Sequence, residues 1–256
     1  MSRAPALIMP LPTSDFDPTE AGVVWRILTD RGYSIAFATP DGGSARADPI
    51  MVTGKGLGLL ANTLRADLHG RSAYALMEAD AAFKKPLSYA ELRVNRYAGL
   101  VLPGGHAKGM RPYLESAVLQ RFVAEFIASG KPTGAICHGV LLAARSIDPQ
   151  TGRSVLAGRQ VTGLPAWMEL LAWSITMAWM GDYYRTYPTT LEREVRSLLD
   201  DKDQFHLGPR SLTRDAPERL QAGFTVRDGA LITARWPGDA HRLGTELAEL
   251  LDARRE

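Results

Sequence analysis

The chain has 256 residues, of which 45% are hydrophobic and 23% are charged. That composition excludes a disordered chain and is typical of a globular protein long enough to bury a substantial core. The 30 basic and 28 acidic residues leave a net charge of +2, so charge gives no reason to expect nucleic acid or an anionic membrane as a partner.

The single cysteine excludes an intrachain disulfide and fits a reducing compartment. No signal-peptide pattern opens the chain, and the apolar run at residues 167–180 is short for a membrane span and interrupted by Glu169. The five histidines are scattered, without the spacing of a zinc site, and no dinucleotide fingerprint is present. We therefore expect a soluble cytoplasmic protein without metal or cofactor.

The first part of the chain predicts alternating strands and helices. Residues 6–9 read as a buried strand, and residues 18–31 as a helix with Asp17 as its N-cap and Pro18 at its first position. A second strand follows at residues 33–38. This strand–helix–strand order favours a parallel sheet with right-handed crossovers.

Residues 44–97 are harder to assign to elements. The glycine-rich stretch at 54–58 lacks the spacing of a phosphate-binding loop. Short helices are expected at residues 59–67, 72–83 and 88–92. We expect this block to be an insertion that covers one face or edge of the sheet.

The remaining elements complete an α/β pattern. Its predicted parts are a central strand at 99–102, an amphipathic helix at 114–129, a strand at 132–136, a helix at 138–144, a turn and strand at 151–163, a hairpin at 224–235 and a last helix ending near residue 254. The sequence predicts one doubly wound, mostly parallel α/β domain over residues 1–256, with insertions at about 44–97 and 165–220.

Cys137 lies where the strand at 132–136 turns into the next helix. A cysteine there occupies a sharp turn above the sheet edge, the geometry of a nucleophile elbow. The unpaired amides of the helix N-terminus should favour the thiolate, and Gly139 leaves room for backbone or substrate. The alternative is an inert buried thiol, because free cysteines are commonly packing residues.

A second motif, Pro-Gly-Gly-His at residues 103–106, follows the central strand. Gly104 and Gly105 allow backbone amides to turn toward the crevice at the carboxyl ends of the strands, where open α/β sheets bind ligands. A plain tight turn is the alternative for the two glycines. His106 faces either a substrate or solvent.

Together, residues 135–139 (Ala-Ile-Cys-His-Gly) and residues 102–106 (Leu-Pro-Gly-Gly-His) resemble the ThiJ/PfpI superfamily. The resemblance is strongest to its glyoxalase III and heat-shock-chaperone branch and covers most of the chain. It implies a flavodoxin-like fold of the class I glutamine amidotransferase type. Ala107 stands where the family often has glycine after the histidine.

The resemblance also implies roles for individual residues. Cys137 would be the nucleophile and His138 its base, which would make the thiolate ready at neutral pH. Glu169, which follows a Thr-Gly pair at 162–163, would orient His138, and Glu20 would be a proton-bearing partner of the sulfur. The amides of Gly105 and His138 would form an oxyanion hole. From the residues alone, Glu20 also fits a capping-box glutamate and Glu169 a solvated helix residue.

Residues 167–187 are unusually rich in tryptophan and tyrosine. Aromatic residues at helical spacing usually belong to a core or an interface. Alternatively, these aromatic residues line a pocket for an apolar substrate. Trp167 is included among the expected substrate-binding residues.

The resemblance implies cofactor-free glyoxalase III activity, methylglyoxal plus water to lactate, or a related deglycase. The expected partner is a small-molecule carbonyl compound, and the expected assembly is a homodimer. Two alternatives stay open. One is a cysteine hydrolase or hydratase acting on an amide, a peptide or an isonitrile. The other is a non-enzymatic stress protein or chaperone with an oxidation-sensing cysteine.

Overall fold

A computed structural model describes residues 6–255 of the chain. Its centre is a seven-stranded sheet in the order β3-β2-β1-β4-β5-β7-β6. Every neighbouring pair is parallel except β6 and β7. The strands are β1 (Ala6–Pro10), β2 (Ser34–Thr39), β3 (Leu87–Ser88), β4 (Gly99–Leu102), β5 (Thr133–Ile136), β6 (Thr225–Asp228) and β7 (Leu231–Ala234).

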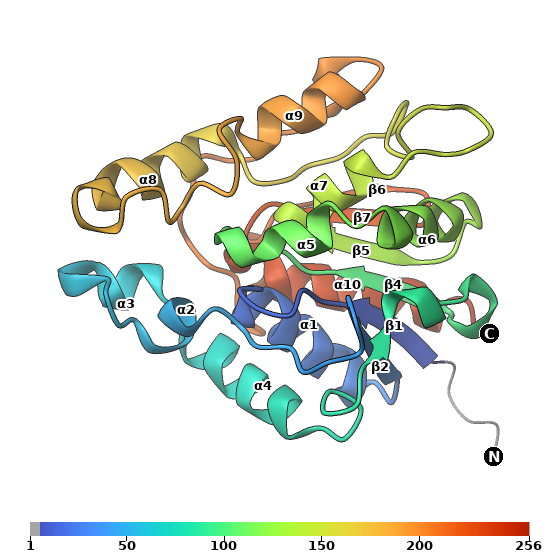
Figure 1. Cartoon of the computed structure of the whole chain (residues 1–256), viewed down its shortest axis with the longest axis horizontal. Coiled ribbons are helices and arrows are strands. Elements are labelled where there is room, and N and C mark those ends of the chain that lie inside the picture. The colour runs from blue at the N-terminus through green and yellow to red at the C-terminus, as the bar shows by residue number, and fades with distance from the viewer. Residues whose placement is uncertain (1–5, 256) are drawn as a thin grey trace.

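Helices cover both faces of this sheet (Figure 1), which confirms the predicted α/β class. One layer holds α1 (Pro18–Asp30), α4 (Leu68–Ala79) and α10 (Ala240–Asp252). The other holds α5 (Arg111–Leu114), α6 (Ala117–Ala128), α7 (His138–Arg145) and α9 (Leu191–Leu198). Strands β4 and β5 are buried at every position, as expected for central parallel strands covered on both sides.

Several helix boundaries differ from the expected ones because a capping side chain sets them. Helix α6 begins at Ala117, since the Ser116 hydroxyl accepts the Leu119 amide. Helix α4 begins at Leu68, since Asp67 accepts the amide of Gly70. The helix expected at 59–67 is reduced to a 3₁₀ turn and the four-residue α3 (Ala61–Leu64).

The strand expected within residues 151–163 is wrong. Val161 instead makes a single bridge to Phe205, with hydrogen bonds to the backbone of residues 204 and 206. The next amide, of Thr162, donates to the Thr233 side chain at 2.9 Å. Because Thr162 is bonded to a side chain rather than to a strand, the ladder stops after one residue.

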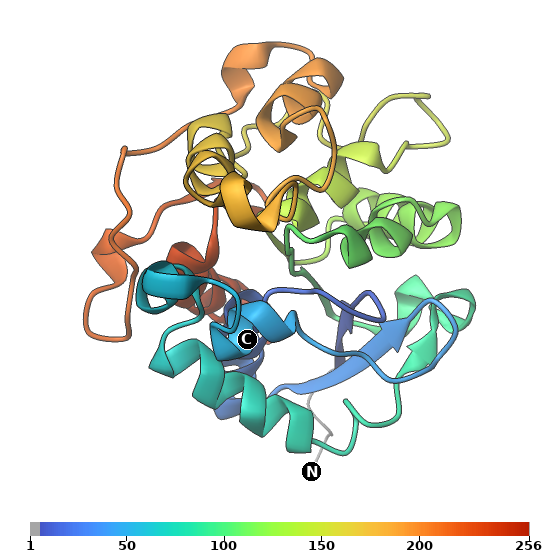
Figure 2. The same cartoon turned by 60° about the vertical axis from the view of Figure 1, so that its left-hand side comes forward.

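The two expected insertions meet each other beyond the sheet. The first contributes α2 (Pro49–Thr53) and α3, and the second contributes α8 (Ala166–Met180), which lies across from them in Figures 1 and 2. Met51, Leu57 and Tyr184 form a separate apolar cluster between them. The Tyr183 hydroxyl donates to Asp48, the N-cap of α2. The division into one domain with two insertions stays a prediction.

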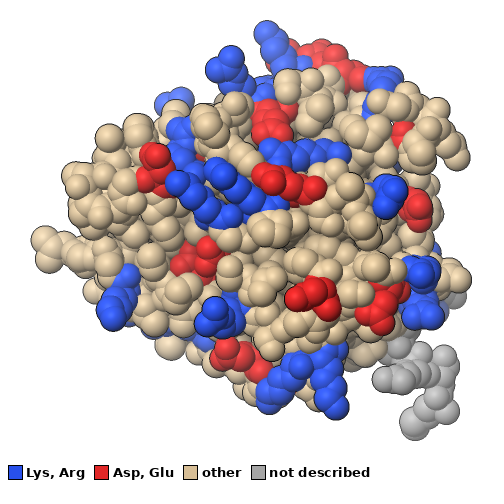
Figure 3. Space-filling model, viewed as in Figure 1, with Lys and Arg blue, Asp and Glu red and all other residues tan. Residues whose placement is uncertain are grey.

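Charged side chains of both signs are interspersed over the face shown in Figure 3. Within residues 6–255, no helix is both long and apolar enough to cross a membrane.

Gly139 sets the distance between helix α7 and strand β4. A Cβ atom added at this position would lie 1.9 Å from the carbonyl oxygen of Leu102, well inside van der Waals contact. The obstacle is backbone, which cannot rotate away. The room that Gly139 leaves is therefore taken by the protein's own backbone rather than by a substrate.

We expect Gly139→Ala to lower the free energy of unfolding by about 3 kcal/mol, since it forces α7 away from β4. Gly152→Ala is the control, because nothing lies within 4 Å of its added carbon and only its positive φ of 68° is strained. That control should cost about 1 kcal/mol. Equal losses in denaturant unfolding of the two variants would contradict the close contact.

Candidate active site

Cys137 occupies the turn between β5 and α7 in a strained backbone conformation. Its φ is 53° and its ψ is −125°, and its side chain is 5% exposed. Its amide donates to the carbonyl of Ala234 on the adjacent strand β7 at 3.1 Å. A positive φ at a non-glycine residue costs free energy and is often found at functional sites. The elbow expected from the sequence is present.

His138 links the sulfur to a threonine. Its Nδ1 atom lies 3.4 Å from Cys137 Sγ, and its Nε2 atom lies 3.1 Å from Thr186 Oγ1. The Thr186 hydroxyl donates its proton to the carbonyl of His106. The hydroxyl therefore receives a proton from Nε2, which assigns the neutral tautomer that leaves Nδ1 bare. A bare Nδ1 facing the sulfur can accept the thiol proton.

Glu169 does not orient His138. One carboxylate oxygen accepts the Leu191 amide at 3.0 Å, and the other lies 3.3 Å from Nε of Arg185. Burial raises the pKa of Glu169 to about 7, although Leu191 and Arg185 oppose the shift. Glu169 is buried rather than solvated and lines the same pocket as the cysteine. Thr186 takes the position beside His138 that the resemblance gave to Glu169.

Glu20 lies beside the sulfur and does not close a capping box. Its Oε2 atom accepts the Gly104 amide at 2.7 Å, and the carboxyl and Cys137 both lie against the backbone of Gly104. The capping-box partner would be the amide of Asp17, but that amide donates to the Gly104 carbonyl at 2.8 Å. Asp17 itself caps α1. The structure therefore joins Glu20 to both predicted motifs.

Burial disfavours the charged forms of the reacting groups. It raises the pKa of Glu20 well above its usual range, and Asp17 adds to the shift. Burial, followed by the charge of Glu20, raises the pKa of the Cys137 thiol, which only the His138 amide lowers appreciably. Burial also lowers the pKa of His138 to about 3. Desolvation therefore outweighs the helix N-terminus and favours the thiol over the thiolate that the resemblance implies, which stays a prediction. These shifts favour a thiol beside a neutral imidazole as the resting pair.

The loop after β4 requires glycine at Gly105. This residue has a φ of 153°, and an added Cβ would lie 2.5 Å from the Asp15 carbonyl oxygen. Gly105 lines the pocket, and its amide has no partner among the hydrogen bonds of the described residues. The His138 amide opposes the rise in the pKa of the Cys137 thiol. An oxyanion hole made by these two amides stays a prediction.

His106 is part of the pocket wall rather than a solvated loop residue. Its ring stacks on Tyr184 with centroids 4.3 Å apart and meets Tyr183 edge-on. Its Nε2 atom is buried without a partner, and burial lowers the pKa of His106 to about 4. His106 is therefore neutral at physiological pH.

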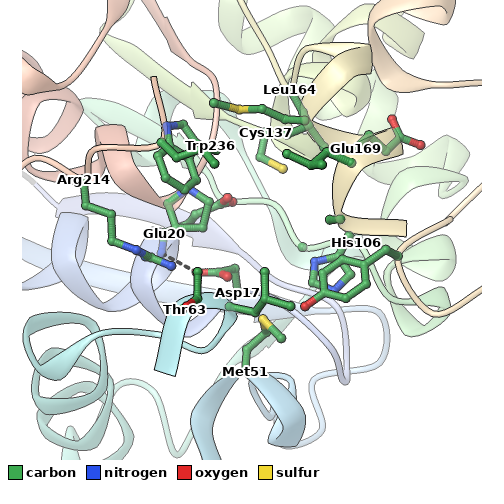
Figure 4. Close-up of a pocket in the computed structure, with 18 of the residues that line it drawn as sticks. Asp17, Glu20, Met51, Thr63, His106, Cys137, Leu164, Glu169, Arg214 and Trp236 are labelled. Carbon is green, nitrogen blue, oxygen red and sulfur yellow. Dashed lines mark hydrogen bonds between the residues drawn. The ribbon is translucent and has the colours of Figure 1, made fainter. Parts of the chain in front are cut away.

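The pocket above Cys137 is small and mostly apolar (Figure 4). Its volume is about 180 Å³, below the roughly 300–1,000 Å³ typical of sites for drug-sized ligands. Its polar walls are Asp17, Glu20, Thr63, His106, Glu169 and Arg214, and its apolar walls include Met51, Leu64, Leu164, Met168, Ala172, Ile175, Leu212 and Trp236.

Trp167, which was assigned to substrate binding, does not line this pocket. It packs against the main hydrophobic core, while Tyr184 and Trp236 supply the aromatic walls. Sequence reasoning missed Thr186, Arg214 and Trp236. Arg214 lies in a polar stretch without periodicity, and a single threonine carries no signal. Trp236 could have been predicted, because it lies just after the predicted hairpin and the strand ends at this edge of the sheet face the ligand crevice.

Among the side chains of residues 6–255, no group of three or more His, Cys, Asp or Glu is arranged to hold a metal ion.

Comparison with known proteins identifies the family. The model of the ThiJ/PfpI family-like proteins matches residues 11–209, and the chain belongs to this family. An uncharacterized protein of Archaeoglobus fulgidus is 41% identical over 167 residues, which are 64% of this chain and 68% of that protein.

Two further similar proteins are described as glyoxalases. The glutathione-independent glyoxalase HSP31 of Saccharomyces cerevisiae is 24% identical over 178 residues, which are 68% of each chain. The crystal structure of glyoxalase III from Candida albicans has a TM-score of 0.68 at 18% identity and covers 97% of this chain and 98% of that one. At 18% identity, the similarity to the Candida albicans structure shows only that the two proteins share a fold.

We expect the alkylation rate of Cys137 by iodoacetamide to keep rising with pH beyond about 8.5, the ordinary thiol pKa, because burial disfavours the thiolate. Glu20→Gln keeps an oxygen for the Gly104 amide but removes the negative charge. It should move the profile to lower pH. A wild-type profile that is already flat by neutral pH would contradict the neutral thiol.

Thr186→Val should slow alkylation of Cys137 at fixed pH about tenfold, since it removes the group that fixes the His138 tautomer. Thr186→Ser, which keeps the hydroxyl, should restore the rate. Glu169→Gln serves as a matched control because Glu169 makes neither contact of His138, and it should change the rate by less than about twofold. If Glu169→Gln were the slower variant, the assignment of Thr186 would fail.

Proposed function

We propose that this chain is a cofactor-free, cysteine-dependent enzyme that converts a 2-oxoaldehyde such as methylglyoxal, with water, to the 2-hydroxy acid. One observation carries the proposal. The Cys137 sulfur lies 3.4 Å from Nδ1 of His138, and Glu20 lines the same small, largely apolar pocket as Cys137. The yeast relative named as a glutathione-independent glyoxalase supports it.

The proposed reaction begins with attack of the Cys137 sulfur on the aldehyde carbon. The thiol proton passes to Nδ1 of His138 and then to the carbonyl oxygen, which gives a hemithioacetal. The hydrogen on that carbon moves to the neighbouring carbon through an enediol, with His138 or Glu20 relaying the proton. The product is a thioester of the 2-hydroxy acid. Water cleaves the thioester, releases the acid and restores the thiol, so no electron donor or acceptor is needed.

The pKa shifts fit these steps. A buried carboxyl such as Glu20, whose pKa is raised, can carry a proton at neutral pH and give it up beside a developing oxyanion. His138 is neutral at rest and therefore able to act as a base. The apolar walls limit the water that would otherwise compete for the intermediates.

A second candidate function is binding of unfolded chains, and the surface of α8 favours it. This helix leaves large apolar side chains 38–53% exposed: Leu170, Leu171, Ile175, Met177 and Trp179. Contiguous exposed apolar surface is typical of protein interaction sites. An oxidation-sensing role is less favoured, since the Cys137 side chain is 5% exposed and its pKa is raised.

We expect the wild type to convert methylglyoxal to lactate without glutathione or added metal, and Cys137→Ser to be inactive. Lactate is measured directly, so loss of methylglyoxal by simple adduct formation does not count. Suppression of aggregation of an unfolded protein is measured on the same two proteins. A wild type that makes no lactate overturns the glyoxalase proposal. Suppression by both proteins would then support the chaperone function.

A further inference from the structure

Buried polar atoms without a partner gather around one pocket. Six such side-chain atoms occur in the described part of the chain, and five belong to residues that line the pocket above Cys137. Those five are Glu20 Oε1, His106 Nε2, the Tyr184 hydroxyl, Arg214 Nη1 and Trp236 Nε1. A buried polar group without a partner is costly, so such groups are rare unless a ligand or ordered water satisfies them.

Arg214 is the cation of this set. Its guanidinium lies over Trp236, 5.3 Å from the ring centre, and its Nη2 atom donates to the carbonyl of Arg65 at 3.3 Å. Its Nη1 atom is buried and unbonded. Figure 4 shows the guanidinium directed into the pocket toward Asp17. Among the ion pairs of the described residues, none includes Arg214.

The acids near Arg214 do not take up its hydrogen bonds. Burial raises the pKa of Glu20 well above its usual range, which disfavours the negative charge that would pair with Arg214. Burial raises the pKa of Asp17 to about 6, and the oxygen of Asp17 that accepts hydrogen bonds receives the amides of Thr19 and Glu20. Asp17 can therefore take up a proton at small cost when an anion binds opposite it. The donor of Arg214 is left for a ligand.

The other walls of the pocket indicate the chemical character of the remainder of that ligand. Its remaining walls are largely hydrocarbon, and Leu212 and Ile175 stay partly exposed at its lining, 55% and 40% respectively. A single guanidinium matches one carboxylate group. The site holds no second free cation for a phosphate dianion among its described lining residues.

We propose that the substrate of this site is a 2-oxoaldehyde that carries a carboxylate on a short hydrocarbon chain, and that Arg214 binds the carboxylate. The identity of the reacting group rests on the proposed function. The binding of the carboxylate by Arg214 does not, so it can be tested separately.

The first experiment compares two substrates of equal length, 4,5-dioxopentanoate and 2-oxopentanal, which differ by a carboxylate in place of a methyl group. The wild type should prefer the anion in kcat/KM, and Arg214→Gln should lower that preference about 10- to 100-fold. Arg214→Lys keeps the charge but not the planar fork and should lie between them. Arg210→Gln is the control, because Arg210 is exposed on the same loop and carries the same charge.

The second experiment needs no turnover. Pentanoate and pentanamide are compared for their ability to slow the alkylation of Cys137 by iodoacetamide. Wild type and Arg210→Gln should be protected by pentanoate at concentrations at least tenfold lower than by pentanamide, and Arg214→Gln should lose this difference. A normal alkylation rate without additive shows that the site of the variant is intact.

The outcomes separate the two proposals. If no dicarbonyl is turned over but protection by pentanoate depends on Arg214, the glyoxalase reaction is wrong and the carboxylate site stands. If methylglyoxal is turned over but Arg214→Gln changes neither the substrate preference nor the protection, the carboxylate site is overturned. A wild type that prefers 2-oxopentanal and pentanamide overturns it as well.

Discussion

Removal of water from around Cys137 and Glu20 is the constraint on which the rest of the site depends. A thiol and a carboxyl in contact with solvent would ionise near their ordinary pKa values. Here both are buried between β4, β5 and α1, and both hold their protons more strongly. In the proposed reaction, the sulfur is therefore activated by proton transfer within the site rather than by a permanent thiolate.

The backbone enforces that burial. Cys137 turns sharply from β5 into α7, and Gly139 lets α7 press against the end of β4. The amide of Gly104, at the end of β4, holds the Glu20 carboxyl that comes from α1. Three elements that are distant in the sequence thus fix the positions of one sulfur and one carboxyl. This arrangement explains why the glycines of the two motifs are needed.

The sequence predicted the parts of the site that local chemistry determines. Strand-to-helix transitions with apolar flanks and glycine punctuation placed Cys137, His138 and the loop of Gly104 correctly, and Glu20 followed from the resemblance. The partner of His138 was missed because Thr186 reaches it from a turn 48 residues away, where no pattern singles out one threonine. Glu169 was misassigned because a carboxylate in an apolar run must be paired, but the sequence does not say with what.

The short turn after α8 contributes both to the wall of the pocket and to the hydrogen bond that orients His138. Tyr183 and Tyr184 hold the His106 wall of the pocket, and Thr186, two residues further on, determines which nitrogen of His138 carries its proton. A compound that displaces this wall also disturbs the base. Because one turn carries both the pocket wall and the partner of His138, we expect substitutions in this turn to change the shape of the pocket and the basicity of His138 together.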